Sequence, residues 1–174
     1  LSLWDVSSAE NLTNMFNTST AMNNSQGLSS TPNASYFDAT TGNDIIKGSQ
    51  GIDDSLRGHN GNDRLKGKGG QDTIFGDEGN DRIFGNSGRD TIFGDEGNDR
   101  LFGNGGRDTL TGGAGRDKLF GDNGQDTLTG GLGNDQLTGG AARDTFCIST
   151  GTGRDVITDY TSGEDKIKLL GGLT

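Results

Sequence analysis

An aspartate recurs every nine residues through the middle of this 174-residue chain. From Gly58 to Cys147 the sequence divides into consecutive nine-residue units, each with glycine at position one and aspartate at position six. Two less regular units precede them, at 39–47 and 48–57, and the second has one extra residue. A fixed period of this kind indicates stacked repeats. The aspartates that we assign to position six are Asp44, Asp53, Asp63, Asp72, Asp81, Asp90, Asp99, Asp108, Asp117, Asp126, Asp135 and Asp144.

Position seven shows that two units make one structural repeat. It alternates between basic and threonine residues, as in Arg64, Thr73, Arg82 and Thr91, so equivalent residues recur after 18 positions. Stacking coils of this length would place every second aspartate in the same column, about 4.8 Å from the next. We therefore expect one column with Asp63 and its equivalents and another with Asp72 and its equivalents.

The side chains in these columns favour a hard metal ion. Carboxylates together with backbone carbonyls are the ligand set of Ca²⁺. Soft metals are disfavoured because His59 is the only histidine and Cys147 the only cysteine. Mg²⁺ is disfavoured because it requires a tight octahedral shell and retains its waters.

Each unit supplies a turn and a short strand. Glycines at positions one and four permit positive φ, and the alternation after position six places the apolar position-eight side chain on one side of a strand. Two units then form one coil of a flattened solenoid with parallel strands on two faces. One inward side chain contributes about 2–3 kcal/mol, whereas ordering nine residues costs on the order of 10 kcal/mol or more, so we expect a bound cation to be needed for folding. The position-eight residues are Leu65, Ile74, Ile83, Ile92, Leu101, Leu110, Leu119, Leu128, Leu137 and Phe146.

The array resembles the RTX, or haemolysin-type, calcium-binding nonapeptide repeat, G-G-x-G-x-D-x-U-x. The resemblance implies an all-β fold, a right-handed parallel β-roll (a β-solenoid) with two repeats per coil and a short β cap at the C-terminus. It implies roughly eight to ten Ca²⁺ ions, held between turns n and n+2 by position-six carboxylates, such as Asp63 with Asp81, and by turn carbonyls. The turn backbone would be supplied around Gly61, Gly70, Gly79, Gly88, Gly97, Gly106, Gly115, Gly124 and Gly133.

The array departs from the family pattern at several positions. Position two is often not glycine, as at His59 and Lys68, which predicts a strained turn or an added ligand. The extra residue in 48–57 predicts a bulge, and Ala39 and Ala142 weaken the two end units as metal sites.

Four segments follow from this pattern: residues 1–16, a linker at 17–38, the array at 39–147, and a C-terminal flank at 148–174. Residues 1–16 read either as a short helix or as a fragment resembling a bacterial surface repeat with the signature W-D-V-S and N-x-x-x-M-F. In the flank we expect two more strands, with Asp155 and Asp159 either as solvated turn residues or as an extra calcium site. The side chains expected to cover the end of the roll are Phe146, Ile148, Val156, Ile157, Tyr160, Ile167 and Leu169.

The outward residues allow alternative interpretations. The phenylalanines at position nine are either stacked between coils or a docking surface. The basic residues at position seven would form a stripe along one outer face, and this stripe is either solvated or a site for a cell-surface anionic polysaccharide. Its members are Arg64, Arg82, Arg100 and Lys118. Two Thr-x-Thr rungs, at Thr109–Thr111 and Thr127–Thr129, are too few for an ice-binding surface.

Composition narrows the function. The net charge of −10 argues against nucleic acid as a partner, and no apolar run is long enough to span a membrane. We find no catalytic constellation and expect no enzymatic activity in this chain. The resemblance implies a secreted or cell-surface bacterial module that folds with calcium and is exported by type I secretion machinery. The alternatives are the C-terminal part of an extracellular hydrolase or epimerase, and a surface adhesin.

Overall fold

The computed structural model describes residues 34–39, 41–149 and 153–171, and the side chains from residue 39 onward. The predictions for residues 1–16, and most of the expected linker, lie outside these ranges. The described part of the chain is all-β and contains no helix. No segment of it is a helix that is long and apolar enough to cross a membrane.

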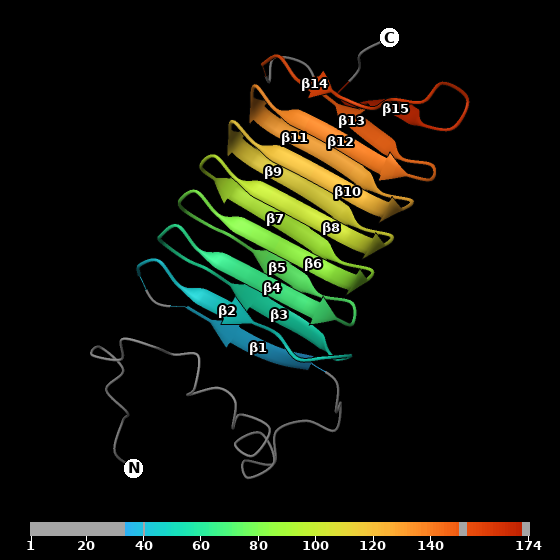
Figure 1. Ribbon diagram of the computed structural model, residues 1–174. Coiled ribbons are helices and arrows are strands. Elements are labelled where there is room, and N and C mark those ends of the chain that lie inside the picture. Colours follow the sequence, from blue (N-terminus) through green and yellow to red (C-terminus); the bar gives the residue numbers. More distant parts are fainter. Residues whose placement is uncertain (1–33, 40, 150–152, 172–174) are drawn as a thin grey trace, which may run out of the picture. The chain divides into compact units, whose positions relative to one another are not determined.

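The strands alternate between two parallel sheets (Figure 1). The odd sheet contains β1 (Ala34–Asp38), β3 (Asp53–Arg57), β5 (Thr73–Phe75), β7 (Thr91–Glu96), β9 (Thr109–Gly115), β11 (Thr127–Gly133), β13 (Thr145–Ile148) and β15 (Lys166–Leu169). The even sheet contains β2 (Ile45–Lys47), β4 (Arg64–Gly69), β6 (Arg82–Gly88), β8 (Arg100–Gly106), β10 (Lys118–Gly124), β12 (Gln136–Ala141) and β14 (Val156–Ile157). This confirms the β-solenoid of stacked parallel strands that the repeat predicts.

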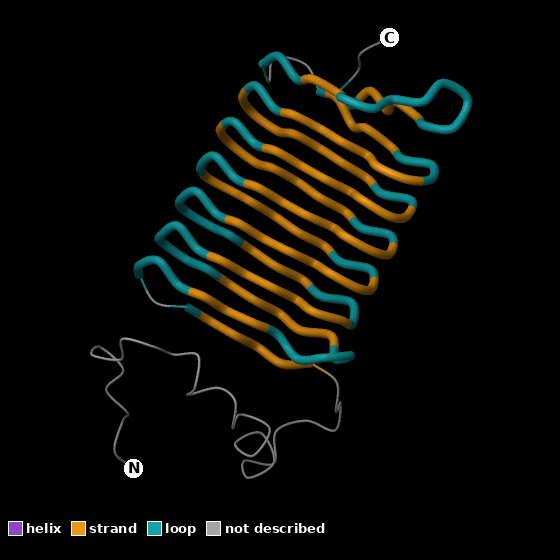
Figure 2. Tube along the Cα trace, viewed as in Figure 1, coloured by secondary structure: helices purple, strands orange, loops and turns teal. Residues whose placement is uncertain are grey.

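Each strand pairs with the strand that follows two places later, 18 residues along the regular part of the chain. Leu65 lies opposite Ile83, and Ile83 lies opposite Leu101. In the odd sheet the same register joins Ile74 to Ile92. Figure 2 shows the result as a stack of similar coils, with strands on the two faces and turns along the two edges.

A single file of apolar side chains fills the space between the sheets. Every position-eight residue predicted to point inward is buried, and Leu56 joins them from the irregular unit. Alternation along each strand, exposed, buried, then half-buried, places position eight inside and positions seven and nine outside. Each unit therefore contributes one side chain to the core. The core residues are Leu56, Leu65, Ile74, Ile83, Ile92, Leu101, Leu110, Leu119, Leu128, Leu137 and Phe146.

The position-nine phenylalanines stack on one another. Phe84, Phe102 and Phe120 form one ladder on the even sheet, with ring centroids 4.9 and 5.0 Å apart and nearly parallel planes. Phe75 and Phe93 form another on the odd sheet, 5.1 Å apart. Identical side chains at strand spacing pack against each other, as the first of the two sequence interpretations expects.

One stretch of the expected linker differs from the sequence expectation. The end of the expected linker forms β1, which pairs with β3 from Ala34 opposite Asp53 to Asp38 opposite Arg57. An unpaired edge of β3 would leave backbone groups without partners, and β1 satisfies them.

The flank contains the two expected strands. They extend the sheets by one strand each, because β14 pairs with β12 and β15 with β13. Phe146 is buried, and Ile148 and Ile157 pack against the core. The other side chains expected to cover the end remain 44% to 58% exposed: Val156, Tyr160, Ile167 and Leu169.

A matched pair of leucines tests the one-residue-wide core. Leu110 is fully buried, whereas Leu132, near the end of β11, is 59% exposed. We expect Leu110→Ala to lower the free energy of unfolding of the folded roll by about 2–5 kcal/mol, and Leu132→Ala to change it by less than about 0.5 kcal/mol. Urea unfolding followed by circular dichroism measures both. Equal losses in the two variants would contradict the assignment of the core.

Candidate functional site: two columns of buried aspartates

The turns at the two edges of the roll bring the position-six aspartates into two columns. Because the chain passes from sheet to sheet once per unit, successive aspartates lie at opposite edges. The first Asp column contains Asp44, Asp63, Asp81, Asp99, Asp117, Asp135 and Asp155. The second Asp column contains Asp54, Asp72, Asp90, Asp108, Asp126, Asp144 and Asp165.

One oxygen of each carboxylate links neighbouring coils. The backbone N–H of Asp81 donates to Oδ1 of Asp99 at 2.8 Å, and the N–H of Asp99 donates to Oδ1 of Asp117 at 2.8 Å. The second column repeats the arrangement, with the N–H of Asp90 donating to Oδ1 of Asp108 at 2.8 Å. Each aspartate therefore holds its own turn against the preceding one, and the side chain is fixed in orientation.

The other oxygen of the same carboxylates has no hydrogen-bond partner. Oδ2 is buried and has no hydrogen-bond partner in ten position-six aspartates, one from each regular unit, and these residues are at most 2% exposed. A buried carboxylate oxygen without a partner is strongly unfavourable unless the charge is compensated. The ten are Asp63, Asp72, Asp81, Asp90, Asp99, Asp108, Asp117, Asp126, Asp135 and Asp144.

The unpaired oxygens face backbone carbonyls beside the position-one glycines. A Cβ built on Gly58 would lie 2.5 Å from Oδ2 of Asp63 and 2.6 Å from the carbonyl oxygen of Gly76 in the next coil. At Gly121 the corresponding distances, to Asp126 and Gly139, are both 2.5 Å. Glycine is required at this position because any side chain would fill the space that the two oxygens border.

This donor set fits a hard cation. A carboxylate oxygen and a carbonyl oxygen converge at most of the position-one glycines, Gly58 and Gly121 among them, and Ca²⁺ accepts both kinds of oxygen at 2.3–2.6 Å. In the described ranges no three His, Cys, Asp or Glu side chains cluster as a metal site. In this part of the chain, side chains alone therefore do not form a coordination shell, and a cation bound there would also need backbone carbonyls.

The position-four glycines, whose backbone the sequence predicts as ligand, also stack coil on coil. Gly79 has φ of 137°, and a Cβ there would overlap the carbonyl oxygen of Gly61 in the coil before. The backbone N–H of Gly79 donates to the carbonyl of Glu96 at 2.8 Å. Gly70, Gly88, Gly97, Gly106, Gly115, Gly124 and Gly133 have the same conformation, with φ between 131° and 147°.

Position two adopts the left-handed conformation even where it is not glycine. His59 and Lys68 have φ of 65° and 82°, and Ala142, at position four, has φ of 87°. Asparagine and aspartate tolerate this region better than other non-glycine residues, and they occupy position two at Asp77, Asn86, Asp95, Asn104 and Asp122. The strain expected from the sequence is therefore concentrated at His59, Lys68 and Ala142. Asp144, in the same unit as Ala142, nevertheless keeps its place in the column.

The irregular unit 48–57 requires a correction to the assigned aspartate. Asp54 is 3% exposed and its N–H donates to Oδ1 of Asp72 at 2.8 Å, as the columns require. Asp53 is exposed, and its Oδ1 accepts from the N–H of Gln71. The extra residue therefore lies in the turn before Asp54, and Asp54 takes the place assigned to Asp53. Counting backwards from Leu56 rather than forwards from Gly48 would have found it.

Two aspartates of the flank continue the columns. The N–H of Asp135 donates to Oδ1 of Asp155 at 3.2 Å, and the N–H of Asp144 donates to Oδ1 of Asp165 at 2.9 Å. Asp165 was not among the predicted residues. The signal was present, since Gly163-Glu-Asp165-Lys-Ile167 matches positions four to eight of the repeat. Asp159 lies elsewhere, accepting from the N–H groups of Gly139 and Gly140.

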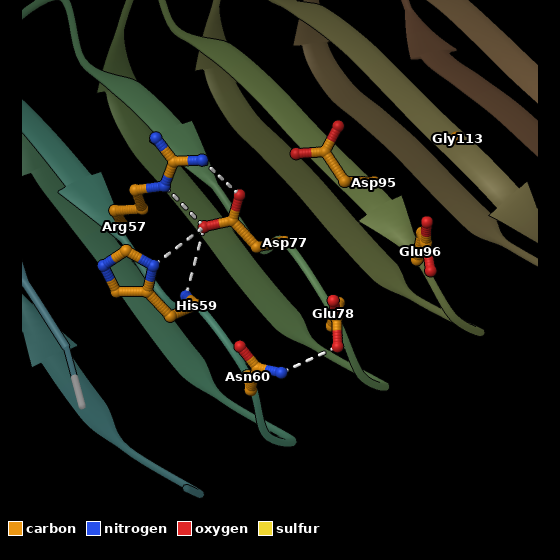
Figure 3. Close-up of a pocket in the computed structure, with 8 residues that line it drawn as sticks. All are labelled: Arg57, His59, Asn60, Asp77, Glu78, Asp95, Glu96 and Gly113. Carbon is orange, nitrogen blue, oxygen red and sulfur yellow. Dashed lines mark hydrogen bonds and ion pairs between the residues drawn. The ribbon is translucent and has the colours of Figure 1, made fainter. Parts of the chain in front are cut away.

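A separate charged cluster lies on the outer surface, at the edge of the roll that carries the first Asp column (Figure 3). Arg57 donates from Nε and Nη2 to the two carboxylate oxygens of Asp77, each at 2.7 Å. These hydrogen bonds hold the pKa of Asp77 below its ordinary value. Asp95, one coil further, has a raised pKa because it is partly desolvated and lies near Asp77. The cluster links coils across the surface, and its carboxylates act on the first Asp column, because Asp77 and Asp95 add to the raised pKa of Asp81.

Burial raises the pKa of the column aspartates. It raises the pKa of Asp99 and of Asp108 to about 7, against a backbone hydrogen bond that lowers it, and neighbouring column carboxylates add to the rise. The pKa of Asp63 rises to about 6 for the same first cause. Without a cation, the folded state therefore binds protons more tightly than the unfolded chain does.

The sign of these shifts predicts how the metal-free chain responds to pH. Protonation stabilises the folded state fully below the unfolded aspartate pKa of about 4, and this stabilisation is lost as pH rises through about 6–7. In excess chelator we expect the β signal in far-UV circular dichroism to grow as pH falls from about 8 to about 5. A chelated chain whose spectrum is constant across this range would contradict the buried, uncompensated state of the columns.

Comparison with known protein families agrees with this geometry. The RTX calcium-binding nonapeptide repeat matches in overlapping stretches at 38–74, 57–92, 75–110, 84–119, 93–128 and 111–146. A search of curated proteins finds no match. The family match covers more than half of the chain, coincides with the two Asp columns, and agrees with the roll of parallel strands. This chain belongs to the RTX calcium-binding nonapeptide repeat family.

Proposed function

We propose that the roll binds a row of Ca²⁺ ions along each edge and that this binding drives its folding. The observation that carries the proposal is the set of ten buried Oδ2 atoms without a hydrogen-bond partner. Membership of a calcium-binding family gives the expected ion. A cation at each turn would compensate the buried charge and crosslink adjacent coils.

The ligands would be the position-six carboxylates and the carbonyls beside the position-one glycines. Asp54 replaces Asp53 in this set, and Asp155 and Asp165 extend it. Roughly eight to ten ions would be bound, as the sequence predicts. Bound Ca²⁺ supplies positive charge and oxygen coordination, while the aspartates orient the turns through Oδ1.

The energetics are sufficient to control folding. Extracellular calcium modules bind with dissociation constants of about 10⁻⁴–10⁻³ M. At ten times that concentration each site adds about 1.4 kcal/mol. Eight sites would add on the order of 11 kcal/mol, comparable with the whole stability of a small domain. The chain would therefore stay unfolded where Ca²⁺ is scarce and fold where it is millimolar.

This dependence suits a module that is exported before it folds. RTX repeats are typically extracellular, and we propose a secreted or cell-surface bacterial setting with type I secretion. The roll would act as a structural module with no catalytic role of its own. A connection to an extracellular hydrolase or epimerase, or to an adhesin, would depend on segments other than the roll.

A calcium titration tests the folding switch. In chelator at about pH 8 the chain should give a coil-like far-UV spectrum, and millimolar Ca²⁺ should convert it cooperatively to a β spectrum. Equal concentrations of Mg²⁺ should not. A β spectrum that persists unchanged in chelator at this pH would overturn the mechanism.

The irregular unit offers a test with a matched control. Asp54→Asn and Asp53→Asn each remove one negative charge and keep a side-chain oxygen acceptor. We expect Asp54→Asn to raise the Ca²⁺ midpoint and to remove about 1.4 kcal/mol of stability at ten times the dissociation constant, whereas Asp53→Asn should leave both nearly unchanged. Urea unfolding at fixed Ca²⁺ measures the difference. The reverse ranking would show that the register of this turn is wrong.

A further inference from the structure

The outer face of the even sheet is strongly cationic although the chain as a whole is acidic. Its position-seven and position-nine residues on β2, β4, β6, β8 and β10 include six of the 15 Lys and Arg residues of the chain and no acidic residue. The net charge of the chain is −10. We define the cationic face by Lys47, Arg64, Lys66, Arg82, Arg100 and Lys118.

The cations of this face are arranged in register. Arg64 lies opposite Arg82, Arg82 opposite Arg100, and Arg100 opposite Lys118 on adjacent strands. Strands are about 4.8 Å apart, so the four charges form a straight row along the roll. Like charges directly opposite one another destabilise a sheet. None of these four side chains forms an ion pair with a carboxylate in the described part of the chain. The row therefore carries an electrostatic cost that the roll itself does not offset with carboxylates.

The aromatic ladder of Phe84, Phe102 and Phe120 lies beside the row. Arg64 and Arg82 lie over the ring of Phe84, 5.3 and 5.2 Å from its centroid, and Arg82 also lies 5.3 Å from the centroid of Phe102. A cation over an aromatic ring is attracted to the ring face, so the ladder holds these guanidinium groups in place on the outer face of the sheet.

The opposite face provides the contrast. The equivalent row on the odd sheet is neutral from Ser55 through Thr91 and Thr109 to Thr145, and its one charged residue is Lys166 at the end. Stacking alone therefore does not require charge at position seven. At physiological ionic strength, screening over about 8 Å lets a ligand respond to the local row more than to the net charge.

We propose that the cationic face binds a linear acidic polysaccharide with one carboxylate per sugar, lying along the roll axis across the strands. A flat face with one cation per coil matches a polymer with regularly spaced single charges. Duplex nucleic acid fits poorly, because it carries one charge per about 1.7 Å and the chain is acidic overall. The proposal goes beyond calcium binding, and it requires only that the roll be folded.

The experiment uses the calcium-saturated chain and a hexamer of galacturonic acid, with neutral maltohexaose as the control ligand. Binding is measured by calorimetry at two salt concentrations. We expect binding of the acidic hexamer that weakens with salt, and none of the neutral one. Absence of hexagalacturonate binding at millimolar concentration by a chain that shows the β spectrum would overturn the proposal and leave the calcium mechanism intact.

A matched pair of double variants locates the site. The first variant, Arg82→Gln with Arg100→Gln, removes two charges from the cationic face. The second variant, Arg89→Gln with Arg107→Gln, removes two charges from the edge of the roll that carries the second Asp column. We expect the first pair to weaken binding by about tenfold and the second by less than about twofold. Both must keep the calcium-induced β spectrum. Equal losses would show a response to net charge, and an effect of the edge pair alone would place the ligand elsewhere. Either result contradicts the proposal.

Discussion

The burial of one half-satisfied carboxylate per turn is the constraint on which the rest of this structure depends. Each of the ten column aspartates from Asp63 to Asp144 uses Oδ1 to receive the N–H of the preceding coil and leaves Oδ2 unpaired in the interior. The hydrogen bond specifies the 18-residue register, while the unpaired oxygen makes the folded state unfavourable without a proton or a cation. The same side chain therefore determines the geometry of the coil and makes its stability conditional.

Other features of the repeat follow from the close packing of backbone around that oxygen. Position one must be glycine because a Cβ would occupy the space between Oδ2 and the next carbonyl. Position four is nearly always glycine because its backbone lies against the carbonyl of the coil before. These requirements leave position eight as the main source of apolar burial, so the core is a single file of side chains. A fold with so small a core is well suited to control by an external ligand.

The roll separates its charges by layer. Negative charge is concentrated in the turns, both in the buried columns and in the surface cluster around Asp77 and Asp95, whereas the outer face of the even sheet is cationic. Repetition makes this possible, since a residue type at one position is copied at strand spacing along the whole axis. The choice of residue at one position of the 18-residue unit therefore sets the character of a whole row along the outer face. The threonine face shows that the two outer surfaces can vary independently of the core.

The sequence by itself determined the period, the two-unit coil, the inward residues and the two columns, because each depends on local spacing alone. Only the tertiary structure decided which of Asp53 and Asp54 enters a column, since that depends on pairing with Asp72 across the sheet. The structure also showed that Asp165 joins the second column. The flank departs from the nine-residue period before Asp165, but β15 still pairs with β13. Where the period is intact, spacing specifies position. Where it is broken, backbone hydrogen bonding between coils selects the residue that enters the column.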